Sequence, residues 1–210
     1  MEVTIINYRK ANIDEIDTLA NICKEAFIDY PLFALLKSNI YKNKNYADYL
    51  LALYKLLIKL YIKFGICIVV ERDNIPVGVA LLHTKDISLF KYIIHGGISL
   101  LKYVSIYNIL SFFVFNDKTT EYLRKNTELD WYLMLLAVSP NYQGQNIGSE
   151  FLVYLDSFII DNGGKSLSFV TNIEKNMHFY SKNNYENVDY KVLHFRGKKI
   201  DNWSFRKIYK

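Results

Sequence analysis

A mixed α/β fold is predicted for this chain of 210 residues by three of its stretches. Residues 131–138, WYLMLLAV, form an unbroken apolar and aromatic run whose length suits a buried strand better than a buried helix. A loop with two glycines follows, and apolar residues then recur at helical spacing. Residues 66–71 and 76–82 predict an antiparallel hairpin, because residues 72–74 between them, Arg-Asp-Asn, favour a tight turn.

The N-terminal third predicts one strand and two helices. Residues 4–9 alternate as a strand does, and Asn12 followed by Glu15 is a helix-capping pattern. The first helix is expected to end at Pro31, and its apolar positions are Ile13, Ile16, Leu19, Ala20, Cys23 and Phe27. Residues 46–64 predict a second helix, with Leu50, Leu53, Leu57, Leu60 and Phe64 on a core-facing stripe and Lys55, Lys59 and Lys63 elsewhere.

An insert at about residues 85–128 separates the hairpin from the strand at 131–138, and it is predicted to be helical. Residues 90–115 are the most apolar part of the chain, but charged residues, histidine, asparagine and glycines interrupt them. A membrane span needs about 20 continuous apolar residues. We therefore expect the insert to cover the sheet or to wall a ligand pocket, and membrane insertion is not favoured.

The C-terminal part completes a single domain spanning residues 1–210. Gly163-Gly164 is expected to end the helix that follows the glycine loop. Residues 165–170 then predict a strand and residues 173–183 a short helix, while residues 185–195 and 203–208 predict a closing hairpin. No repeat, linker or low-complexity segment divides the chain.

Composition narrows the class of protein. With 51% hydrophobic and 22% charged residues, the chain is typical of a globular protein. Its net charge of +5 includes no basic run, so no nucleic-acid partner is indicated, whereas an anionic ligand would suit it. Cys23 and Cys67 lie in apolar patterns and are expected to be buried reduced thiols. The first residues lack a signal-peptide pattern, and a cytoplasmic location is expected.

The order of strand, glycine loop and helix suits an anion. The first turn of a helix leaves main-chain N–H groups unpaired and carries a partial positive charge, so the backbone alone can hold a phosphate. Such a loop needs residues that adopt positive φ and carry little side chain. Gly144, Gly148 and Ser149 meet this requirement, and asparagine, here Asn146, tolerates positive φ best among the other residues.

The same segment, Gln143-Gly144-Gln145-Asn146-Ile147-Gly148, resembles the pyrophosphate loop of the GNAT superfamily of acetyl-CoA-dependent N-acyltransferases, Gln/Arg-x-x-Gly-x-Gly/Ala. The preceding LLAVSPNYQG is similar to the approach to that loop. Residues 176–185, NMHFYSKNNY, resemble the second GNAT signature, Asn-x-x-Phe-Tyr-x-x-x-Gly-Phe. Asn146 and Asn184 stand where the two motifs have glycine.

The resemblance implies a fold and an activity. The expected fold is a twisted, mostly antiparallel mixed sheet of six to seven strands, splayed at the cofactor strand, with helices on both faces and the insert between the third and fourth strands. The expected reaction moves the acetyl group of acetyl-CoA to a primary amine of a small molecule or peptide by direct attack in a ternary complex. No metal is expected, and a homodimer is possible.

The resemblance also assigns site residues. Ala137, Val138 and Ser139 would bind the pantetheine arm through main-chain groups, and the amide near Val138 would stabilise the oxyanion. Asn176 would hydrogen-bond the arm or cap its helix, and Tyr180 would protonate the departing thiolate or merely pack. The residues expected around the pyrophosphate are Gln143, Gly144, Asn146, Ile147, Gly148 and Ser149.

Two questions stay open at this stage. The general base has four candidates, Glu128, Asp130, His83 and His178, none of them favoured over a structural role, and a relay through water is also possible. Because asparagine replaces glycine in both motifs, a second class of function stays open, namely a module that binds and senses acyl-CoA without turnover. A third possibility is an unrelated nucleotide-binding α/β protein. It is disfavoured, because the sequence contains neither a complete P-loop motif, Gly-x-x-x-x-Gly-Lys-Ser/Thr, nor a fingerprint of three glycines.

Overall fold

The computed structural model describes residues 5–209, in which seven strands form a single sheet in the order β1-β2-β3-β4-β5-β7-β6. All neighbouring strands are antiparallel except β4 and β5, which are parallel. The strands are β1 Ile6–Lys10, β2 Ile66–Arg72, β3 Ile75–His83, β4 Trp131–Val138, β5 Ser166–Thr171, β6 Glu186–Phe195 and β7 Lys198–Ile208. The predicted fold class is therefore confirmed. Residue 4, which the first predicted strand included, lies outside the described residues.

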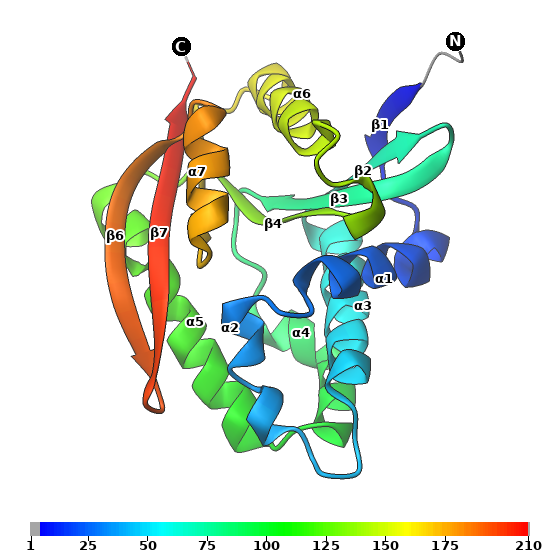
Figure 1. The fold of residues 1–210 in the computed structure, drawn as a ribbon, viewed down its shortest axis with the longest axis vertical. Coiled ribbons are helices and arrows are strands. Elements are labelled where there is room, and N and C mark those ends of the chain that lie inside the picture. The colour runs from blue at the N-terminus through cyan, green and yellow to red at the C-terminus, as the bar shows by residue number, and fades with distance from the viewer. Residues whose placement is uncertain (1–4, 210) are drawn as a thin grey trace.

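Helices cover both faces of the sheet (Figure 1). α1 and α3 pack against one face and α6 and α7 against the other, each pair with its own apolar core. The α-helices are α1 Ile16–Phe27, α2 Pro31–Ala34, α3 Tyr46–Phe64, α4 Leu89–Ile94, α5 Ile106–Asn126, α6 Ile147–Asp161 and α7 Glu174–Lys182. The 3-10 helices are η1 Ile13–Glu15, η2 Lys37–Asn39, η3 Gly97–Lys102 and η4 Pro140–Tyr142. Cys23 and Cys67 are buried free thiols, as expected.

Local sequence signals account for several element boundaries. The Glu15 carboxylate accepts a hydrogen bond of 2.8 Å from the Asn12 main-chain N–H, which is half of the predicted capping pair. Asp73 and Asn74 both have positive φ, at 53° and 65°. Two consecutive left-handed residues twist a hairpin in the direction that its strands require. The turn is therefore these two residues, and Arg72 belongs to β2.

Three expectations were wrong in detail. Pro31 does not end the first helix, which stops at Phe27, but begins the short helix α2, where its missing N–H leaves no hydrogen bond unmade. Phe64, the last residue of α3, leaves the buried stripe: it is 39% exposed and stacks on His95. β7 starts five residues before the predicted position, since polar residues concealed its first half.

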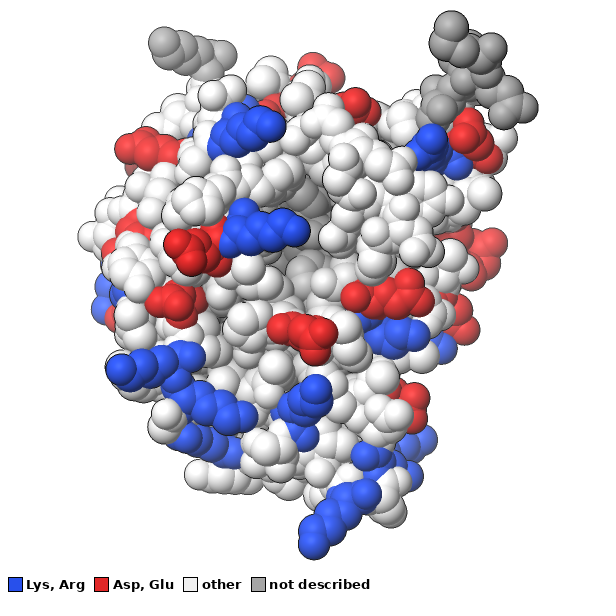
Figure 2. Space-filling view, viewed as in Figure 1, with Lys and Arg blue, Asp and Glu red and all other residues white. Residues whose placement is uncertain are grey.

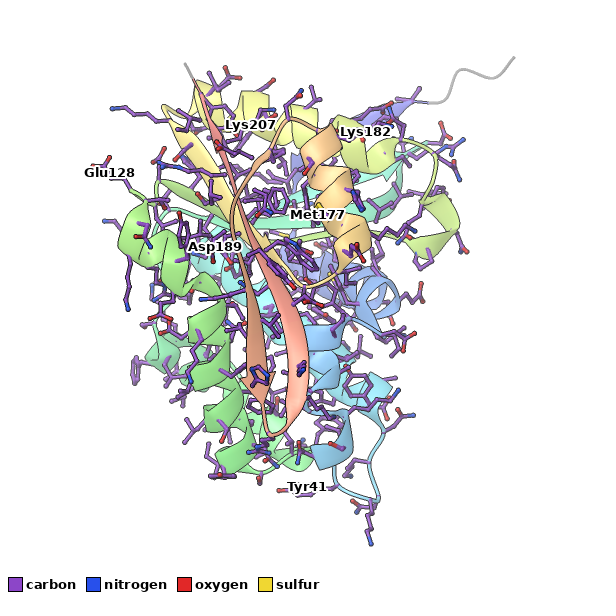
Figure 3. The ribbon with its side chains drawn as sticks, turned by 60° about the vertical axis from the view of Figure 1, so that its left-hand side comes forward. Tyr41, Glu128, Met177, Lys182, Asp189 and Lys207 are labelled. Atoms are coloured by element: carbon purple, nitrogen blue, oxygen red, sulfur yellow. The ribbon has the colours of Figure 1, made fainter. Side chains whose placement is uncertain are left out.

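The insert forms α4, η3 and α5. α5 lies along β5, β6 and β7, and Figure 3 shows the β6–β7 hairpin, with Asp189 on β6, between α5 and α7, which carries Met177 and Lys182. Within residues 5–209 no helix combines the length and apolar character that crossing a membrane requires.

Asp156 of α6 fastens that helix to the C-terminal strands. Its carboxylate accepts hydrogen bonds from the hydroxyls of Tyr185 and Tyr209, at 2.6 and 2.7 Å, and forms an ion pair of 2.6 Å with Lys207. The Asp156 side chain is only 13% exposed. Because α6 begins at the glycine loop, this cluster also fixes the position of the loop.

We expect Asp156→Ala to lower the free energy of unfolding by about 3 kcal/mol, since it leaves a partly buried ammonium group and two hydroxyls without their shared acceptor. Urea denaturation followed by circular dichroism measures the change. Lys125→Ala is the matched control, because it breaks an exposed ion pair with Glu121 of the same 2.6 Å length and should leave the midpoint unchanged. Equal effects of the two substitutions would contradict a structural role for Asp156.

Candidate active site

The sheet opens between β4 and β5. β4 pairs with β3 as far as Val138, but it pairs with β5 only through Trp131 and Tyr132. Beyond Tyr132 one edge of β4 therefore has no neighbouring strand in the described chain. Such an edge presents unpaired main-chain groups that an extended ligand can use.

Hydrogen bonding to β3 determines which residues of β4 face the opening. The Ser139 N–H donates to the Val77 carbonyl at 2.8 Å. Since successive residues of an antiparallel strand point their main-chain groups to opposite sides, Ala137 also faces β3. Leu136 and Val138 face the opening. Of the three residues predicted to bind the pantetheine arm through the main chain, only Val138 turns its main-chain groups to the opening. Leu136, which was not predicted, shares this orientation.

The glycine loop next to this edge has the predicted main-chain geometry. Gly144 and Asn146 have positive φ, at 76° and 66°, and α6 starts at Ile147. Among the described residues, no protein acceptor receives the N–H groups of residues 144–148. The Ser149 N–H, in contrast, donates to the Asn146 carbonyl at 3.0 Å. The loop therefore offers a run of main-chain donors at a helix start, the arrangement that binds anions.

Two side chains brace the loop. The Gln143 amide donates to the Val138 carbonyl at 2.9 Å, so Gln143 ties the loop to the end of β4. Arg72 donates to the side-chain oxygen of Gln145 and lies over the ring of Tyr142, 5.8 Å from its centroid. Arg72 was missed, because its position at the β2–β3 turn is far from the loop in sequence.

Gly148 allows α6 and α7 to approach each other. A Cβ at this position would lie 3.2 Å from the ring of Phe179. The absent side chain therefore makes room for α7, the helix that carries Tyr180 and Asn176. Figure 2 shows the surface hollowed between α6 and α7 on this face of the molecule.

Tyr180 is held in an aromatic cluster and lines the cavity below the opening. Its ring lies 4.3 Å from that of Phe169 and 5.7 Å from that of Phe205, between ring centroids. Burial, with a smaller effect of Tyr30, raises the pKa of the Tyr180 hydroxyl above its ordinary value. Tyr180 therefore keeps its proton through neutral and moderately alkaline pH, as a proton donor must.

Tyr30 reaches the same place from the other end of the chain. Its hydroxyl accepts a hydrogen bond of 3.0 Å from the Asn172 N–H at the end of β5, and it lies 3.4 Å from the Thr171 hydroxyl. The sequence could not place Tyr30 beside β5, since this contact joins residues more than 140 positions apart. Asn176 lines the cavity as well, and it is not the N-cap of α7, which is Ile173.

The cavity has a volume of about 300 Å³ and extends from the opening beneath β4 towards α5. Aromatic side chains make up much of its wall, among them Tyr30, Phe33, Tyr61, Phe112, Tyr132 and Tyr180. Its far end is polar. There the two imidazole nitrogens of His83 contact the Tyr61 hydroxyl at 2.8 Å and Asp86 at 3.2 Å, and Arg124 pairs with both Asp86 and Asp117.

The four candidate bases are dispersed. His83 lines the cavity, and burial lowers its pKa, an effect that Asp86 partly opposes. Asp130 accepts hydrogen bonds from the main-chain N–H groups of Lys165 and Ser166 and so joins the starts of β4 and β5. Glu128 and His178 are exposed. No cluster of metal-binding side chains occurs within residues 5–209.

Several solved structures with the same fold are described as N-acetyltransferases. Polyamine N-acetyltransferase from Drosophila melanogaster, described as forming N-acetylagmatine, superposes with a TM-score of 0.67 at 15% identity, covering 98% of this chain and 100% of its own. An apo variant of agmatine N-acetyltransferase gives 0.67 at 17% identity, covering 97% and 99%. The Thermoplasma acidophilum PaiA N-acetyltransferase in complex with coenzyme A gives 0.55 at 16% identity, covering 98% and 99%.

A comparison with curated protein sequences gave no match. The sequence model of the acetyltransferase (GNAT) family, in contrast, matches residues 35–185, which include the opening in the sheet, the glycine loop and Tyr180. This match covers well over half of the chain, and it agrees with the fold and with both motifs. The chain is an acyltransferase and belongs to the GNAT acetyltransferase family.

Proposed function

We propose that this protein transfers the acetyl group of acetyl-CoA, the co-substrate of its family, to a primary amine of a small molecule by direct attack in a ternary complex. The observation that carries the proposal is the unpaired edge of β4, which leads from the donors of the glycine loop into the cavity. An extended pantetheine arm requires this continuity, because its diphosphate end and its thioester end must be bound at the same time.

The main chain supplies most of the cofactor contacts in this proposal. The N–H groups of residues 144–148 hold the diphosphate, while Leu136 and Val138 bind the arm in place of a neighbouring strand. An N–H of this pair donates to the oxyanion that forms when the amine attacks the thioester carbonyl. Removing such a donor typically costs about 10²- to 10³-fold in rate. Ser149, whose N–H is already bonded, contributes at most its hydroxyl.

Tyr180 donates the proton in the second step. The new C–N bond forms first, and collapse of the oxyanion then breaks the C–S bond, so a thiolate leaves and takes the tyrosine proton. Tyr30 is less suited to this role because its hydroxyl donates its proton towards the Asn172 side-chain oxygen, at 3.4 Å. The attacking amine loses its proton to water in the cavity or to a base.

The cavity supports a small acceptor with an apolar body. About 300 Å³ enclosed by aromatic side chains suits one small molecule better than a peptide chain. His83 pairs with Tyr132, four residues before Leu136, so the polar end lies about 13 Å along the strand from the reacting centre. The polyamine and agmatine acetylated by the compared enzymes are also small amines.

An amine panel tests the acceptor class. We expect thiol release from acetyl-CoA to be fastest with an arylalkyl primary amine such as 2-phenylethylamine, slower with agmatine, and slowest with a lysine-containing peptide. Continuous detection of free coenzyme A measures the rates. Preference for the peptide would contradict the small-molecule acceptor. Thermal stabilisation by acetyl-CoA without release under any acceptor would favour the alternative of a sensor.

Gly148→Asp should abolish coenzyme A binding, since the new side chain meets Phe179 and brings negative charge to the diphosphate site. Titration calorimetry with coenzyme A measures the affinity. Gly148→Ala separates crowding from charge and should weaken binding less. Asn146→Gly, which restores the motif glycine at a positive φ, should preserve binding. Unchanged affinity in Gly148→Asp would remove the loop from the proposed site.

Tyr180→Phe should reduce turnover by about 10- to 10⁴-fold and leave coenzyme A binding nearly unchanged. Steady-state rates and calorimetry together separate the two effects. Because burial raises the pKa of Tyr180, the unmodified enzyme should lose no activity through ionisation of this residue below about pH 10. Tyr107→Phe on the exposed side of α5 is the matched control. Full activity in Tyr180→Phe would leave the residue a packing role only.

A further inference from the structure

The insert exposes large apolar side chains on its outer side. The apolar face, as we define it, consists of Leu89, Phe90, Ile93 and Ile94 of α4, Ile98 and Leu101 of η3, and Leu110 and Phe113 of α5. Phe90, Ile98 and Ile94 are 68%, 63% and 55% exposed. An edge-to-face contact of 5.8 Å between the rings of Tyr92 and Phe113 joins α4 to α5. Surfaces of this kind mark interaction sites.

The insert also has an inner side, which packs on α3 and lines part of the cavity. Leu100 and Val104 are buried against α3, and Tyr92 lines the cavity. α4 rests on the end of α3, where the Lys91 ammonium lies 4.0 Å above the ring of Phe64. The insert is therefore apolar on two sides. The inner side is apolar because it covers the core. The apolar side chains of the outer side contact no other part of the described chain that would explain them.

Most charges around the apolar face are positive; the carboxylates that flank it, Asp86 and Asp117, both pair with Arg124. No aspartate or glutamate occurs in residues 87–116 of the insert or in residues 49–64 of the adjoining α3. These two segments carry five exposed or half-buried lysines. Lys55 pairs with Asp17 of α1, and the other four are Lys59, Lys63, Lys91 and Lys102. The Lys59 ammonium donates to the His95 carbonyl at 3.4 Å. Partial desolvation and then the charges of Lys63, Lys59 and Lys91 lower the pKa of His95.

We propose that the apolar face binds the surface of a lipid bilayer that contains anionic lipids. Apolar side chains enter the boundary between headgroups and acyl chains, while the surrounding lysines meet lipid phosphates. This mode needs no membrane-spanning helix. A second copy of the chain fits less well, because a two-fold interface would bring the lysines of one copy against those of the other. The face lies on α4, η3 and α5, remote from the glycine loop on the other side of the sheet (Figure 1).

Vesicle flotation with the full-length protein tests the proposal. We expect the protein to float with phosphatidylcholine vesicles containing about one third phosphatidylglycerol and to stay in solution with phosphatidylcholine alone. Binding should weaken when NaCl is raised from about 0.1 M to about 0.5 M, because salt screens the lysine contacts. Failure to bind the anionic vesicles at low salt would overturn the proposal.

Two double variants separate the apolar and the charged contributions. Phe90→Ser with Ile94→Ser should lower the partition coefficient about 10-fold or more, since both side chains are largely exposed. Lys63→Glu with Lys91→Glu should lower it by at least about 10-fold, because each lysine near an anionic surface contributes about a factor of five. Unchanged thermal unfolding midpoints show that the variants are folded.

Matched controls change the same residue types at remote exposed positions. Val153→Ser with Ile160→Ser on α6, and Lys10→Glu with Lys165→Glu, should bind vesicles as the unmodified protein does. Equal losses in test and control variants would contradict a localised binding face. Analytical ultracentrifugation gives a further decisive result: a dimer that Phe90→Ser with Ile94→Ser dissociates would make the face a subunit interface and overturn the proposal.

Discussion

The early end of pairing between β4 and β5 is the constraint on which the site depends. Two contacts hold the strand starts together: Asp130 accepts N–H groups from the start of β5, and Gly164 fits beneath Trp131, where a Cβ would lie 2.6 Å from the indole nitrogen. Beyond Tyr132, β4 follows β3 while β5 follows β7. The strands are therefore joined at one end and separate at the other, and the cavity lies below the separation.

Contacts made by the helices fix the positions of the elements on either side of that opening. α6 is fastened to β6 and β7 through Asp156, and α7 approaches α6 closely because position 148 has no side chain. On the other side of the sheet, Tyr30 bonds the end of β5 from the segment between α1 and α2. Elements from both ends of the sequence thus determine the width of one opening, and a preorganised main-chain site needs this support.

The features that could be predicted from the sequence are those that depend on neighbouring residues in the chain. The bounds of α3 and β4 agree with the prediction, and the left-handed conformation of Asn146 follows from its place in the loop. The orientation of main-chain groups was not predictable for Ala137 and Ser139, since it depends on which neighbour pairs with β4. Contacts between distant segments were also out of reach, as for Arg72. Asn202 is fully buried in the half of β7 that was missed, where it donates to the Thr119 carbonyl at 3.0 Å.

The length of the cavity has a kinetic consequence. It runs from Tyr180 at the opening to His83 and to Asp86, whose side chain is largely exposed at the far end. In the proposed reaction the coenzyme would therefore load past α6 and α7, and the amine past α5. Since neither path crosses the other, either substrate could add first and either product could depart first. Such a random sequential scheme gives intersecting double-reciprocal plots and makes each product a competitor only of the substrate that shares its entrance.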